Sequence, residues 1–100
     1  MGYKVIWTDE AIADLHALVT FISQDNPEAA VRFGEVVVSK SFILAEHPRL
    51  GKRLRHSDRE TLRELSAPPY RVIYEIRDAD GGSILIRMVR HGARQEPEIQ

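Results

Sequence analysis

Residues 70–77 read YRVIYEIR, and this alternation decides the fold of the second half of the chain. Val72, Tyr74 and Ile76 fall on one face of an extended segment. The other face carries Arg71, Ile73, Glu75 and Arg77. Because side chains of a strand alternate between its two faces, the segment is predicted to be a β-strand with one face against a core.

The flanking segments predict further strands. Asp-Gly-Gly at residues 80–82 predicts a hairpin turn. Residues 83–90 then predict a last strand, whose apolar side chains populate both faces and therefore indicate an interior position. Residues 61–66 predict a preceding strand, which ends before two consecutive prolines. Residues 52–60 are polar and basic, and we expect them to form a loop.

The first half of the chain predicts one strand and two helices. Residues 3–7 are mostly β-branched or aromatic and predict a short strand. Apolar residues at spacings of three and four predict a helix over about residues 8–24, with Thr8 as its N-cap. Asn26 and Pro27 predict the start of a second helix, which runs to about residue 46.

The order of these elements predicts an α+β fold, written βααβββ, in a single domain of residues 1–100. Two antiparallel helices are expected to pack on one face of a small, largely antiparallel sheet of three to four strands. The opposite face is left as a concave surface. We expect function to lie there.

Charge is distributed unevenly along the chain, although the net charge is only −1. Residues 1–48 carry three basic and seven acidic side chains, whereas residues 49–100 carry eleven basic and eight acidic ones. Most of the basic residues are arginine, whose planar guanidinium suits carboxylates and phosphates. The second half is expected either to meet an anionic partner or to form a solvated face of ion pairs.

The sequence argues against disulfides, metal or cofactor sites, and a membrane or secreted location. The chain has no cysteine, which excludes disulfides and thiolate chemistry. Its histidines show no metal-ligand spacing, and no phosphate-binding loop or dinucleotide motif is present, so we expect no metal and no cofactor. No long apolar run and no signal-peptide pattern occurs, so we expect a cytoplasmic protein without membrane contact.

Short motifs follow one another in a fixed order over residues 3–95. They are Trp7-Thr8, Ala11 and Asp14-Leu15; Asn26-Pro27, Ala29-Ala30 and Phe33; Leu44-Ala45, Pro48, Leu50 and Gly51; Arg63-Glu64-Leu65; Tyr70-Arg71-Val72-Ile73-Tyr74; and His91-Gly92-Ala93-Arg94. In this order and spacing they resemble the RelE/ParE superfamily of toxins from type II toxin–antitoxin systems. The resemblance implies the βααβββ fold, a role of the plasmid-stabilisation kind, and a cognate antitoxin that keeps the toxin inactive. Operator DNA would be reached only through the antitoxin.

The superfamily divides by target. RelE-like members are ribosome-dependent endoribonucleases that cut mRNA, whereas ParE-like members have no nuclease activity and bind DNA gyrase. Leu62, Glu64 and Ser66 stand where RelE-like members carry two lysines and an arginine. These mismatches favour a ParE-like gyrase inhibitor. The alternative is a RelE-like mRNA interferase that acts on the ribosome and mRNA, and a third hypothesis is a toxin-like fold that only binds its antitoxin.

The favoured hypothesis expects no catalytic residue. Its expected partner contacts are Ile12, Val19 and Phe21 on the helices and Arg63, Arg71, Arg87, Arg90, His91 and Arg94 in the second half. Under the nuclease alternative, the candidate catalytic residues around a phosphate are Arg63, Arg71, His91 and Arg94. Both residues also have plainer interpretations. Arg63 could equally form an ion pair with an acidic neighbour, and His91 could form a structural hydrogen bond.

Overall fold

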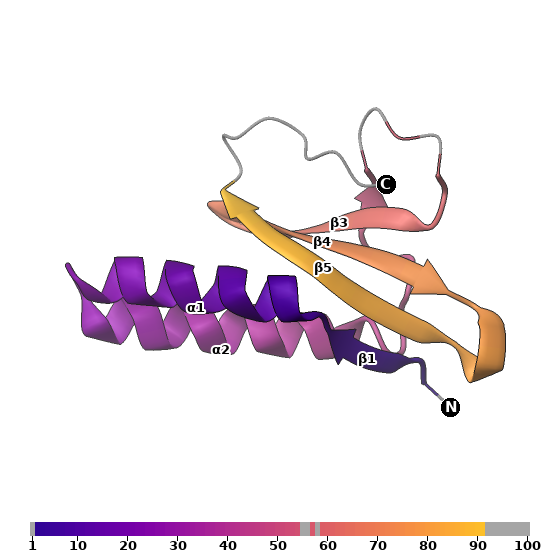
Figure 1. Cartoon of the computed structure of the whole chain (residues 1–100), viewed down its shortest axis with the longest axis horizontal. Coiled ribbons are helices and arrows are strands. Elements are labelled where there is room, and N and C mark those ends of the chain that lie inside the picture. The colour runs from indigo at the N-terminus through magenta and orange to yellow at the C-terminus, as the bar shows by residue number, and fades with distance from the viewer. Residues whose placement is uncertain (1, 55–56, 58, 92–100) are drawn as a thin grey trace.

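The computed structural model describes residues 2–54, 57 and 59–91, and the predicted βααβββ order is confirmed. The elements are β1 (Lys4–Trp7), α1 (Asp9–Ser23), α2 (Pro27–Ile43), β2 (Lys52–Arg53), β3 (Leu62–Ala67), β4 (Tyr70–Arg77) and β5 (Ser83–His91). The five strands form one sheet in the order β1-β5-β4-β3-β2, in which only the pair β1 and β5 is parallel. Both helices lie on the same face of this sheet (Figure 1).

The sheet has one strand more than the three to four predicted, because β2 falls within the segment predicted as a loop. Lys52 and Arg53 pair with Glu64 and Arg63 of β3. Two exposed, charged residues carry no periodicity, so their sequence contains no strand signal.

Both helices begin where the capping residues predict. Thr8 and Asn26 each accept a hydrogen bond from the backbone amide three residues later, at 3.2 and 3.1 Å. Each bond satisfies an amide that the first turn of a helix leaves unpaired. The second helix ends at Ile43 rather than near residue 46, because the chain tightens into a turn there.

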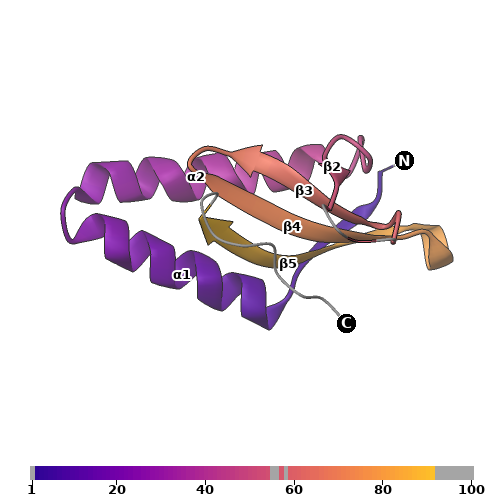
Figure 2. The same ribbon diagram turned by 90° about the horizontal axis from the view of Figure 1, so that it is seen from above.

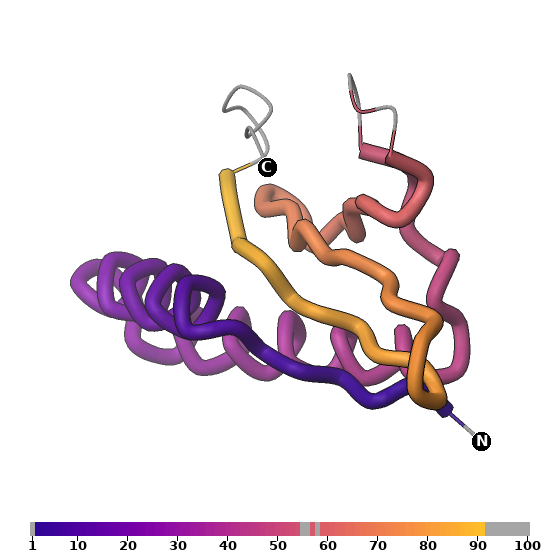
Figure 3. Tube along the Cα trace, turned by 45° about the vertical axis from the view of Figure 1, so that its right-hand side comes forward, coloured from indigo at the N-terminus to yellow at the C-terminus, as the bar shows by residue number. Residues whose placement is uncertain are grey.

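The main core lies between the helices and the sheet. Val72, Tyr74 and Ile76 face the helices and are buried, as the alternation predicts. The remaining buried members of this cluster are Ala11, Val37, Leu44, Ala67, Ile84 and Ile86. The hairpin end of the helix pair extends beyond the strands (Figures 2 and 3).

The opposite face of the sheet carries a second, smaller apolar cluster. Its members are Leu54, Leu62, Ile73 and Met88. The pairing of β4 with β5 shifts between Ile73 and Tyr74, which leaves Arg87 as the extra residue of a β-bulge. Because of the bulge, Arg87 and Met88 both project onto the face opposite the helices. β5 lies between β1 and β4, so its predicted interior position is confirmed.

Candidate functional site

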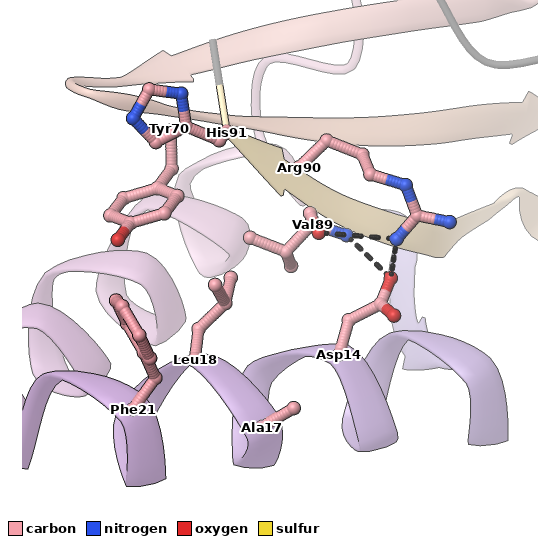
Figure 4. Close-up of a pocket in the computed structure, with 8 residues that line it drawn as sticks. All are labelled: Asp14, Ala17, Leu18, Phe21, Tyr70, Val89, Arg90 and His91. Carbon is pink, nitrogen blue, oxygen red and sulfur yellow. Dashed lines mark hydrogen bonds and ion pairs between the residues drawn. The ribbon is translucent and has the colours of Figure 1, made fainter. Parts of the chain in front are cut away.

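A pocket of about 440 Å³ opens between α1 and the ends of β4 and β5. Its lining residues are Asp14, Ala17, Leu18, Phe21, Tyr70, Val89, Arg90 and His91 (Figure 4). Leu18 and Phe21 rise from α1 toward the strands, and Phe21 is 65% exposed. Apolar side chains that line an open pocket in this way are typical of a binding site for another molecule.

One end of the pocket is closed by contacts between α1 and β5. Asp14 Oδ2 accepts hydrogen bonds from Arg90 Nη1 at 2.8 Å and from the backbone amide of Val89 at 3.0 Å. Within the described residues, β1 pairs with β5 only as far as Ile86, so no strand lies beside Val89 on its outer side. Asp14 thus satisfies an edge amide that an added strand could otherwise bind.

The other end of the pocket is built from aromatic rings. The ring of Phe33 on α2 lies 4.6 Å from that of Tyr70, measured between centroids. The imidazole of His91 meets Tyr70 edge-on at 5.4 Å. These contacts hold the ends of β4 and β5 against α2, and they leave His91 at the rim of the pocket.

The helix pair exposes much apolar surface. Large apolar side chains of α1 and α2 that are at least 46% exposed are Ile12, Phe21, Val31, Val36, Phe42 and Ile43. Phe21 faces the pocket, whereas Ile12 lies nine residues earlier and therefore on the opposite side of α1. Val19 shares the side of Ile12 and lies beside Gly34 of α2. The three predicted helical contacts thus belong to two surfaces.

The sheet face opposite the helices carries two buried carboxylates, of which Glu75 is 6% exposed. Its Oε2 lies 3.1 Å from Arg59 Nη2 and 3.2 Å from Arg77 Nε. Its Oε1 binds Arg87 Nη1. The three arginines come from the loop before β3, from β4 and from β5, so one carboxylate ties three segments together.

The second buried carboxylate is Glu64 of β3, which is 5% exposed. Its Oε2 lies 2.9 Å from Arg71 Nη1, and its Oε1 lies 3.6 Å from Lys52 Nζ. Glu64 pairs across the strands with Ile73, so it shares a face with Glu75. The ion pairs expected of the basic second half are therefore present on this face, and an anionic partner for this half stays a prediction.

Comparison with known proteins gives the family of the chain. Residues 5–96 match the family described as "ParE toxin of type II toxin-antitoxin system, parDE". The chain belongs to this ParE toxin family. The toxin is also 38% identical over 92 residues to Toxin RelE2 of Caulobacter vibrioides, a match that covers 91% of this chain and 97% of the relative.

Solved structures agree with the fold. The toxin–antitoxin complex RelBE2 from Mycobacterium tuberculosis contains a chain with a TM-score of 0.66 and 29% identity, covering 91% of the toxin and 99% of that chain. The chromosomal ParDE system from P. aeruginosa gives a TM-score of 0.69 at 23% identity, covering 89% of the toxin and 95% of that chain. The second likeness supports the fold alone.

The basic residues predicted as partner contacts are spread over three places in the toxin. They are Arg71 and Arg87 on the face opposite the helices, Arg90 and His91 at the pocket, and Arg63 on the helix side of β3. Arg94 lies outside the described residues. The described candidates for catalysis are therefore not gathered around one point, because Arg63 and Arg71 lie on opposite faces of the sheet.

Arg63 has a structural environment of its own. Its Nη1 donates to the carbonyl oxygen of Gly51 at 3.1 Å, and its Nη2 pairs with Glu60. The side chain is 13% exposed. The plainer interpretation of Arg63, an ion pair with an acidic neighbour, describes what the structure contains.

Three acidic residues of the toxin that organise these surfaces were absent from the predicted site: Asp14, Glu64 and Glu75. The sequence did contain a signal for Glu75, because the alternation places it on the same strand face as Arg71 and Arg77. A buried charge requires a partner, and these arginines could supply one. The sequence contained no such signal for Asp14, because Arg90 is 76 residues away in the sequence. Within the described residues, His, Cys, Asp and Glu side chains form no group of three suited to a metal ion, and no helix there has the length and apolarity to cross a membrane.

Acid is expected to weaken the folded toxin through Glu75. Burial raises the pKa of the Glu75 carboxyl, but the hydrogen bonds and charges of Arg77, Arg59 and Arg87 outweigh burial and hold the pKa below its ordinary value of 4.5. A lowered pKa in the folded state stabilises the fold above the unfolded-state pKa. That contribution is lost as the pH falls through the folded-state pKa. We therefore expect Glu75→Gln to lower the free energy of unfolding at neutral pH by about 1.5–3 kcal/mol.

The test is urea unfolding of both proteins from neutral to acidic pH. The difference in unfolding free energy should begin to shrink below about pH 4.5, where the Glu75 carboxyl of the unfolded chain takes up a proton, and it should be lost as the pH falls through the lower folded-state pKa. Glu35→Gln, an exposed residue of α2, makes the same substitution away from the arginines and should change little. A difference for Glu75→Gln that stays constant over the whole range would contradict the assigned ion pairs.

Proposed function

We propose that this toxin inhibits DNA gyrase by binding alone and that a cognate antitoxin holds it inactive. The proposal rests on the state of the sheet face opposite the helices. Cleavage of RNA needs a base, an acid and cations that are free to meet a phosphate. Leu62 and Glu64, at positions where RelE-like members carry basic residues, are buried, and Glu64 binds Arg71. This arrangement supports a toxin that acts without cutting RNA.

A second candidate function is ribosome-dependent cleavage of mRNA. It is favoured by the names of two relatives, Toxin RelE2 and the RelBE2 complex, at 38% and 29% identity. Under this alternative His91, exposed at the end of β5, is the candidate acid or base. Arg71 would have to leave Glu64 before it could meet a phosphate.

The antitoxin is proposed to anchor in the pocket between α1 and β5. Both structural relatives described above come from toxin–antitoxin systems. Leu18, Phe21 and Val89 offer an apolar surface to a side chain of an amphipathic segment. The basic excess of residues 49–100 would attract an acidic antitoxin, which speeds association and adds selectivity.

The gyrase proposal is tested with purified toxin, DNA gyrase, relaxed plasmid and ATP. We expect supercoiling to fall and gyrase-linked linear DNA to accumulate, while mRNA on translating ribosomes stays intact. Toxin premixed with its antitoxin serves as the inactive control. Cuts in mRNA at codon boundaries that disappear in a His91→Ala variant would instead establish the second candidate.

A further inference from the structure

The sheet face opposite the helices has the composition of an anion-binding surface. Five cationic side chains surround its two carboxylates, which leaves an excess of three positive charges. The cations are Lys52, Arg59, Arg71, Arg77 and Arg87. Clustered arginines of this kind are the usual donors to nucleic-acid phosphates.

Space and donors for an external phosphate are present. The side chains of Arg77 and Arg59 are 59% and 38% exposed, so part of each guanidinium faces solvent. Each guanidinium has five N–H donors. Arg59 and Arg77 each contact only one oxygen of Glu75, which cannot accept from all five. A pocket of about 530 Å³ lies beside Lys52 and Arg71 at the other end of the face.

The centre of the surface is nevertheless occupied. Glu75 and Glu64 are held by the strands and almost fully buried, so they cannot diffuse away from the arginines as a free anion would. A phosphate that approached the cluster would meet the fixed negative charge of the two glutamates, which cancels two of the five positive charges on this face. Replacing either glutamate by glutamine would remove its negative charge and keep the shape of the side chain.

We propose that Glu64 and Glu75 are built-in anions that close the arginine-lined sheet face to the phosphates of RNA. Glu75, which meets three arginines, is the main determinant of this specificity. A purely structural role for Glu75 predicts only lower stability on its replacement. The closed-face proposal predicts in addition a new affinity for RNA.

The inference deepens the proposed function, because a toxin that binds a protein target gains from rejecting RNA. Its test does not involve gyrase. A toxin that fails to inhibit gyrase would leave the comparison of RNA binding unchanged, so the two proposals can fail separately.

The probe is a fluorescently labelled single-stranded RNA of about 12 nucleotides, followed by anisotropy with full-length toxin freed from its antitoxin. Glu75→Gln is expected to bind at least about tenfold more tightly than wild type, with a steeper dependence on salt. The matched control is Glu35→Gln, which changes the net charge equally from an exposed site on α2. Adding Arg77→Gln and Arg87→Gln to Glu75→Gln should abolish the gain.

Circular dichroism at low temperature establishes that each variant is folded. Should Glu75→Gln fail to fold, Glu64→Gln serves in its place, with a smaller expected gain because Glu64 contacts one arginine and one lysine rather than three arginines. The proposal is overturned if the folded variant binds RNA no better than wild type, or if Glu35→Gln gains as much. Tight RNA binding by the wild-type toxin would overturn it as well.

Discussion

Replacing Phe21 by glutamate is expected to weaken the toxin–antitoxin complex on the order of 100-fold while leaving the toxin folded. Phe21 is 65% exposed, so the free toxin loses little packing with it. In the complex, however, the pocket beside Leu18 and Val89 would be dehydrated, and a carboxylate there would lose its water without gaining a partner. Titration calorimetry with the antitoxin measures the effect, and growth on co-expression should no longer be rescued.

Thr20→Glu is the control for this prediction. Thr20 is exposed on the same turn of α1 but does not line the pocket. The substitution Thr20→Glu therefore adds the same negative charge to α1 outside the pocket. We expect the antitoxin to bind this variant with nearly wild-type affinity. Equal losses for Thr20→Glu and Phe21→Glu, or no loss for either, would place the antitoxin on a different surface.

The architecture was predictable because local patterns agreed with one another. The alternation at 70–77 assigned Val72, Tyr74 and Ile76 to the core, and all three are buried. Thr8 and Asn26 marked the starts of the helices through capping chemistry that depends only on nearby residues. These signals are local, so a single sequence contains them.

The details of the sheet were not predictable, because they depend on contacts between segments that lie far apart in the sequence. The bulge at Arg87 depends on how β4 and β5 pair, and it places Met88 on the same face as Arg87 and Glu75. The blurred alternation of residues 83–90 hinted at an irregular strand without fixing its register. Contacts such as Asp14 with Arg90 join distant segments, and no periodicity reports them.

The sequence predicted the charge of the candidate site but not how its side chains are arranged. An arginine-rich second half was evident, and Arg71 and Arg87 do lie on one face. The sequence did not reveal that Glu64 and Glu75 would be buried among those arginines. Whether a basic segment offers free cations or paired ones depends on tertiary contacts, and this difference decides which chemistry the face can perform.

Replacing Gly51 by alanine is expected to have the largest effect on stability. A Cβ at this position would lie 2.5 Å from the Glu64 carbonyl oxygen and 2.8 Å from the Tyr74 ring and hydroxyl. Tyr74 cannot move aside, because it is buried, donates to the Pro48 carbonyl at 2.7 Å and accepts from the Gly51 amide at 2.9 Å. We expect a loss of about 3 kcal/mol or more in unfolding free energy, and a melting temperature lower by about 10–20 °C.

Gly34→Ala makes the same chemical change where the structure has room. Its Cβ would lie 3.7 Å from Val19 Cγ2, an ordinary van der Waals distance, in the interior of α2. Because alanine favours a helix over glycine by roughly 0.5–1 kcal/mol, this variant should melt a few degrees higher than wild type. Thermal unfolding of the two variants should therefore give shifts of opposite sign. A Gly51→Ala toxin that melts within a few degrees of wild type would show that the turn at Gly51 is not clamped between Glu64 and Tyr74 as described.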